Sequence, residues 1–141
     1  YVADMVLKKI GRVLFTGSDA IGGPAPGDGF IASTKFAQEH PEALKDVLRA
    51  QFAATDFIKS HPDEAYKSMA AFAKVNEAAV RYSFEKNLIG VAPTYVPDVD
   101  GIVSTEAIAQ ELGFAPKGVD LPAFAKQFNN TSYAKAVLAE K

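Results

Sequence analysis

Cysteine is absent from the 141 residues, and histidine occurs only twice. A chain without cysteine has no disulfide, no thiolate nucleophile and no zinc–thiolate site. The absence fits a bacterial exported protein, but many cytosolic proteins also lack cysteine, so it does not locate the protein. It does exclude the whole class of cysteine chemistry.

Long apolar runs and a large excess of one charge are also missing. Lys, Glu or Asp interrupts the apolar stretches within a few residues, so the sequence contains no candidate membrane span. The formal net charge is −2, from 15 basic and 17 acidic residues. This near balance gives no electrostatic footprint for nucleic acid or for an anionic membrane surface. The length and the 48% of hydrophobic residues are those of one ordinary globular domain.

Common catalytic motifs are missing as well. The sequence has no Gly-x-Ser-x-Gly nucleophile motif. The Gly-rich stretch 22–27 lacks the Lys-Ser/Thr pair of a phosphate-binding loop. Asp98 and Asp100 lie in a Pro/Gly turn without the further oxygen ligands of a calcium loop. The sequence therefore predicts no catalytic constellation, no metal site and no cofactor.

Apolar residues recur at helical spacing from residue 33 almost to the end. Ser33 or Thr34, Asn76 and Ser104 are candidate N-caps, and Pro41 suits the first position of a helix. Gly113 is a candidate left-handed helix stop. The predicted helices cover 2–10, 34–39, 41–59, 62–74, 77–89, 105–112, 121–128 and 133–139.

Two short segments have the composition of strands. β-Branched and aromatic residues fill 12–16 and 28–33. The stretch 17–28 between them is dense in Gly and Pro, which predicts a loop.

Both histidines precede a proline and an acidic residue, as His40-Pro41-Glu42 and His61-Pro62-Asp63. A residue before proline avoids the helical region, and a carboxylate in the first turn complements the helix dipole. We interpret both as helix starts rather than metal ligands.

The run GFIASTKFAQEHPEALK at 29–45 continues to AATDFIKSHPDEA at 53–65, and ELGFAPK, VDL and TSY follow at 111–117, 119–121 and 131–133. In this order and spacing the motifs resemble the nitrate/sulfonate/taurine-type solute-binding proteins of ABC importers. That family includes binders of a thiamine pyrimidine precursor.

The resemblance implies an α/β fold, as a fragment of a two-lobe, type 2 periplasmic-binding-protein fold. Residues 1–27 would end the second lobe, 28–33 would be the return crossover (hinge) strand, and 34–141 the C-terminal helical part of the first lobe. This part would be mostly helical with two or three short strands. The N-terminal half of the same protein would be missing, which agrees with a first helix that has no N-cap residue ahead of it.

The function implied is solute capture by lobe closure, with delivery of a small, anionic or heteroaromatic solute to a membrane permease. The implied protein is periplasmic, or lipid-anchored and extracellular in a Gram-positive organism, and is no enzyme. Two alternatives remain open: a thiamine-pyrimidine-synthesis enzyme of the same fold, and a stand-alone helical interaction domain.

The resemblance also places candidate ligand residues. The loop 22–28 would lie at the cleft, where backbone amides of Gly22, Gly23 and Gly27, together with Asp28, could contact an anionic solute. Tyr1 is a further candidate. A plain surface turn, and a core or surface tyrosine, are the alternatives.

Overall fold

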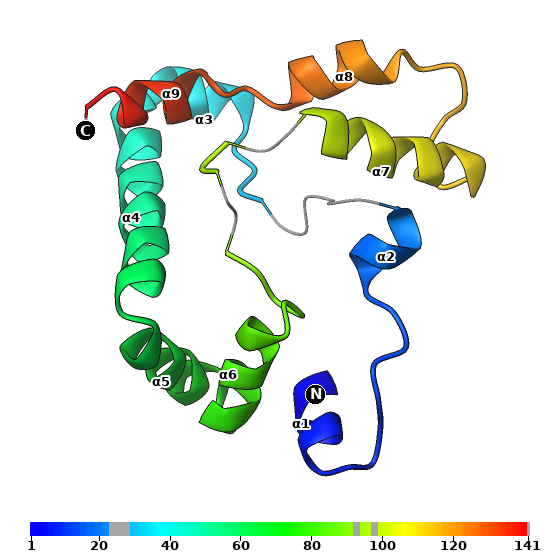
Figure 1. Cartoon of the computed structure of the whole chain (residues 1–141). Helices are drawn as coiled ribbons and strands as arrows, with labels where there is room; N and C mark the ends of the chain where they lie inside the picture. The colour runs from blue at the N-terminus through cyan, green and yellow to red at the C-terminus, as the bar shows by residue number, and fades with distance from the viewer. Residues whose placement is uncertain (23–28, 92–93, 97–98, 141) are drawn as a thin grey trace. The chain divides into compact units, whose positions relative to one another are not determined.

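The chain is described by a computed structural model that covers residues 1–22, 29–91, 94–96 and 99–140 (Figure 1). All regular structure in these ranges is α-helical. The helices are α1 (Val2–Leu7), α2 (Gly17–Ile21), α3 (Thr34–Glu39), α4 (Pro41–Ser60), α5 (Pro62–Ala73), α6 (Glu77–Glu85), α7 (Val99–Glu111), α8 (Leu121–Phe128) and α9 (Ser132–Leu138).

The prediction of an α/β fold with short strands is wrong for the described residues. Residues 11–16 and 29–33 have the composition of strands, yet neither forms one. Leu14 and Phe30 are about 70% exposed, at 73% and 71%. A strand exists only when a neighbouring strand takes up its N–H and C=O groups, and the described residues contain no strand.

Most helices begin where the sequence predicts. The Ser33 hydroxyl accepts the amide of Phe36 at 3.1 Å, and Asn76 and Asp120 cap α6 and α8 in the same manner. Tyr1 precedes α1 without a side-chain cap bond, as expected. The two long helices predicted at 41–59 and 62–74 are confirmed as α4 and α5.

Several boundaries differ from the prediction. Ser104 is no cap, because α7 begins at Val99 and the Ser104 hydroxyl donates to the carbonyl of Asp100 inside the helix. α6 ends at Glu85 because Asn87 takes a left-handed φ of 53°. α2 lies in the stretch predicted as loop, where Gly17 begins five helical residues.

The chain forms two compact units. The first contains residues 1–16 and 50–93, with α1, α5, α6 and the last part of α4. The second contains 17–49 and 94–141, with α2, α3, the start of α4 and α7 to α9. This division does not test the predicted lobe boundaries, which stay a prediction. None of the helices in the described ranges is long and apolar enough to cross a membrane.

Each unit has a small core built largely from alanine. In the first unit Phe52 is 2% exposed, and alanines of α1, α5 and α6 are also buried: Ala3, Ala65, Ala70 and Ala79. In the second, α7 and α8 pack together, with Ile102 and Ala125 buried. Small side chains allow close approach of helices but bury little apolar area each, so single large residues dominate.

Phe52→Ala should therefore lower the free energy of unfolding by about 3 kcal/mol, because it removes a large side chain from a closed site. Phe72→Ala is the control, since Phe72 is a helical phenylalanine of the same unit with 92% exposure. It should change stability by less than about 0.5 kcal/mol. Urea denaturation measures both, and equal losses would contradict the assignment of Phe52 to the core.

Candidate functional site

The described part of the chain does not test the predicted ligand site, because it includes only Tyr1 and Gly22 of the five candidate residues. Tyr1 is fully exposed, and its carbonyl accepts the amide of Met5 at 3.0 Å. Gly22 follows α2 with a φ of 79°, which favours glycine. Gly23, Gly27 and Asp28 lie outside the described residues. Tyr1 belongs to the first unit and Gly22 to the second, so the ligand site remains a prediction.

The two histidine–proline segments form corners of the same geometry. Each histidine is preceded at four residues by a phenylalanine and followed by Pro and an acidic residue. His40 joins α3 to α4 with φ −132° and ψ 54°, and His61 joins α4 to α5 with φ −132° and ψ 59°. The same local sequence thus produces the same turn twice.

The corners leave no backbone group of the histidines unpaired. The amide of His40 donates to the carbonyl of Phe36 at 2.8 Å, and that of His61 donates to Phe57 at 2.7 Å. Each histidine carbonyl then accepts the amide four residues on, from Leu44 or Ala65, which makes the first hydrogen bond of the next helix. Proline at the first helical position lacks an N–H that would otherwise need a partner. One residue therefore closes one helix and opens the next.

The imidazoles pack on the preceding phenylalanine rings. The rings of Phe57 and His61 stack at 4.9 Å, and those of Phe36 and His40 lie tilted at 5.2 Å. The sequence-based interpretation of helix starts is confirmed by the positions of α4 and α5. The His61 side chain, however, makes no cap hydrogen bond; its role at the corner is packing.

His61 also contacts a hydroxyl, which raises the question of a serine–histidine catalytic pair. Ser60 Oγ lies 2.8 Å from His61 Nδ1 and also donates to the carbonyl of Asp56 at 2.8 Å. A hydroxyl has one proton to donate. With that proton on the Asp56 carbonyl, Ser60 Oγ is the acceptor and Nδ1–H the donor. In that arrangement the imidazole does not take the hydroxyl proton, so the contact gives no support to Ser60 as an activated nucleophile.

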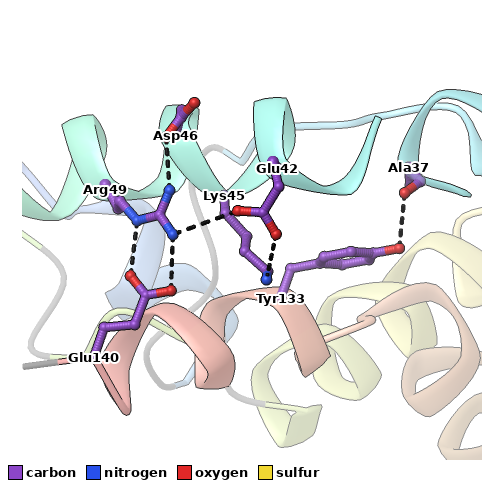
Figure 2. A network of polar contacts seen from close by, with 7 residues as sticks. All are labelled: Ala37, Glu42, Lys45, Asp46, Arg49, Tyr133 and Glu140. Atoms are coloured by element: carbon purple, nitrogen blue, oxygen red, sulfur yellow. Dashed lines mark hydrogen bonds and ion pairs between the residues drawn. The ribbon is translucent and has the colours of Figure 1, made fainter. Parts of the chain in front are cut away.

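A charged network centred on Arg49 joins α4 to α9 within the second unit (Figure 2). The guanidinium donates through Nε and Nη2 to the two carboxylate oxygens of Glu140, at 2.7 and 2.8 Å. Arg49 Nη1 donates to a carboxylate oxygen of Asp46 at 2.6 Å, and a carboxylate oxygen of Glu42 lies 3.7 Å from Arg49 Nη2. At the other end of α9 the Tyr133 hydroxyl donates to the carbonyl of Ala37 in α3 at 3.0 Å.

The network shifts the pKa of its members in the directions that favour the ionised pair. Hydrogen bonds from Arg49 lower the pKa of Glu140 from its ordinary value of 4.5, while partial desolvation opposes them. Hydrogen bonds to Glu140 and Asp46 raise the pKa of Arg49. Because Glu140 is the group with the depressed pKa, its contribution to stability is full above pH 4.5 and is lost as the pH falls through the folded pKa.

A second charged centre lies in the first unit. Arg81 of α6 contacts Asp63 of α5 at 2.8 Å and Glu77 at 3.5 Å, and lies 5.3 Å from the centre of the Tyr66 ring. Hydrogen bonding to Asp63 raises the pKa of Arg81. Tyr66 in turn stacks on Phe84 at 4.9 Å. These contacts join α5 to α6.

Sequence reasoning missed both arginines as centres of contact. Asp46–Arg49 and Glu77–Arg81 have helical spacing that indicates local pairs, and this signal was present. The bond from Arg49 to Glu140 spans most of the chain and has no such signal. In chemical terms the described residues offer ion pairs and aromatic contacts, and they include no group of three or more His, Cys, Asp or Glu able to hold a metal ion.

A comparison with known proteins gives one partial similarity. The chain is 42% identical over 43 residues to the 4-amino-5-hydroxymethyl-2-methylpyrimidine phosphate synthase of Candida albicans (strain WO-1). These residues are 30% of this chain and 13% of the synthase, so the chain matches only a small part of that relative. No protein-family profile and no solved structure matches the chain.

The similarity supports the coarser part of the predicted resemblance, the link to proteins of the thiamine pyrimidine. It gives no support to the ABC-importer part. The prediction that the protein is no enzyme is contradicted, because the matched relative is named a synthase.

The Ser60–His61 contact predicts the tautomer of a neutral imidazole. Neutral His61 should carry its proton on Nδ1, because Ser60 accepts there, whereas most neutral imidazoles in water carry it on Nε2. Nitrogen-15 NMR of the two histidines measures this, with His40 as the internal control. Ser60→Ala should return His61 toward the Nε2–H form, and an unchanged tautomer in that variant would contradict the assigned hydrogen bond.

The Arg49 network predicts a change in the titration of one carboxylate. Arg49→Gln should raise the pKa of Glu140 toward 4.5, because the largest cause of its depression is lost. Carboxyl carbon-13 NMR across the acidic range measures it. Arg81→Gln removes the matched arginine of the first unit and should leave Glu140 unaffected; an equal effect of both variants would contradict a direct bond.

Proposed function

We propose that this chain is part of an enzyme that makes or uses the phosphorylated aminopyrimidine of thiamine synthesis. The observation that carries the proposal is the 42% identity over 43 residues to a pyrimidine phosphate synthase. One further support is the motif order of residues 29–138, which resembles a family that includes binders of a thiamine pyrimidine precursor.

A phosphorylated ligand needs a cation, and the three arginines differ in their availability. Arg49 and Arg81 are each held by two or more carboxylates. Arg12 is exposed in the extended segment 11–16 and has no carboxylate partner among the described residues. A guanidinium binds phosphate through two parallel hydrogen bonds, and a competing carboxylate would prevent this. Arg12 is therefore our candidate for the phosphate contact.

The experiment measures binding and turnover with the complete gene product that contains this chain. Calorimetric titration with 4-amino-5-hydroxymethyl-2-methylpyrimidine and with its phosphate ester should show tighter binding of the ester. Arg12→Gln should weaken binding of the ester by roughly tenfold or more, the loss of one charge-assisted contact, and leave the free pyrimidine unchanged. Lys117→Gln, another exposed cation, is the control and should change neither.

Mass spectrometry of the reaction mixture separates an enzyme from a receptor. Formation or consumption of the pyrimidine phosphate supports the proposal. Tight binding of nitrate, a sulfonate or taurine with no pyrimidine chemistry would overturn it in favour of an importer's solute receptor.

A further inference from the structure

The two histidine–proline corners have the same backbone conformation but differ in the contacts that their helices make with neighbouring helices. At the second corner α5 packs on α6. Ala65 and Ala70 of α5 and Ala79 and Val80 of α6 are below 9% exposed, and Tyr66 stacks on Phe84. The Arg81–Asp63 pair adds a charged contact between the same two helices. α5, on one side of this corner, is thus packed against a neighbouring helix of 9 residues.

The first corner is spanned by α9, which has only seven residues. Tyr133, in its first turn, bonds to Ala37 of α3. Glu140, just beyond its last turn, bonds to Arg49 of α4. Figure 2 shows these contacts at opposite ends of α9, one on each side of the corner.

Between the two anchors, α9 buries only Ala134 and Val137, which lie one turn apart on the same face. A helix this short does not persist alone in water, so tertiary contacts must supply its stability. Two small apolar residues supply little of it. The polar anchors at the ends therefore add contacts that α9 needs to stay in place, whereas α5 and α6 pack on each other along their length.

We propose that α9 is a releasable strap that fixes the angle between α3 and α4 at the His40–Pro41 corner. When both anchors are formed, α9 is bonded to α3 at one end and to α4 at the other, so the two helices cannot reorient relative to each other. With the anchors broken, α9 unfolds locally, and the single non-helical residue His40 becomes a hinge. The groups that act on the charged anchor are Glu42, Lys45, Asp46, Arg49 and Glu140. High salt and acid both weaken it.

The test uses the full chain with Tyr133→Phe and Glu140→Gln combined, which removes one hydroxyl and one charge without a change of side-chain size. Hydrogen exchange followed by mass spectrometry should show a several-fold rise in exchange at α9 and little change in α5 and α6. Residual dipolar couplings of backbone amides should show that α3 reorients relative to α4. The matched control is Glu77→Gln with Asp63→Asn, which removes the charged contacts of the second corner and should leave α5 and α6 protected.

A salt titration of the unmodified chain gives a measurement that does not depend on whether the variant folds. Sodium chloride raised to about 1 M shortens the screening length to ~3 Å and should selectively increase exchange at α9. Exchange at α9 that stays unchanged in both experiments overturns the proposal. So does a rise of equal size in every helix, because it shows that α9 opens only when the whole chain unfolds.

Discussion

Proline at positions 41 and 62 imposes the constraint on which the path of α3, α4 and α5 depends. Proline has no N–H and forces the residue before it out of the helical region, so a helix must end at His40 and again at His61. The histidine amide and carbonyl still find partners on either side, from Phe36 and Leu44 or from Phe57 and Ala65. The chain thus changes direction in one residue with its backbone hydrogen bonds intact, and neighbouring helices need only hold the resulting angle.

The helices beside the two corners are held by different kinds of contact. α5 and α6 bury alanines and Val80 against each other, which works at any salt concentration. α9 contributes only Ala134 and Val137 and relies on a bidentate ion pair at the surface, whose strength depends on ionic strength and on the ionisation of Glu140. We therefore expect two corners that share the pattern Phe-x-x-x-His-Pro-acidic to differ in their response to salt and acid, because of residues far away in the chain.

The same distinction explains how much the sequence could predict. Local rules predicted helices at 41–59 and 62–74, each with a carboxylate after its proline, and caps at Ser33 and Asn76. The structure confirms them as α4, α5 and the N-caps of α3 and α6. The prediction of strands at 12–16 and 28–33 is wrong for the described residues, 12–16 and 29–33. Composition indicates only a tendency, and a strand also needs a partner strand. The prediction of Ser104 as an N-cap is wrong because α7 begins earlier, at Val99.

The site could be predicted least, and the reason is physical. A ligand site gathers residues distant in sequence, as the bond between Arg49 and Glu140 does within one unit, and no periodicity encodes such a pair. The contacts of the individual arginines are more informative here than sequence motifs. Carboxylates hold Arg49 and Arg81 in ion pairs. Of the three arginines, Arg12 is the one that lies exposed in a segment without regular structure.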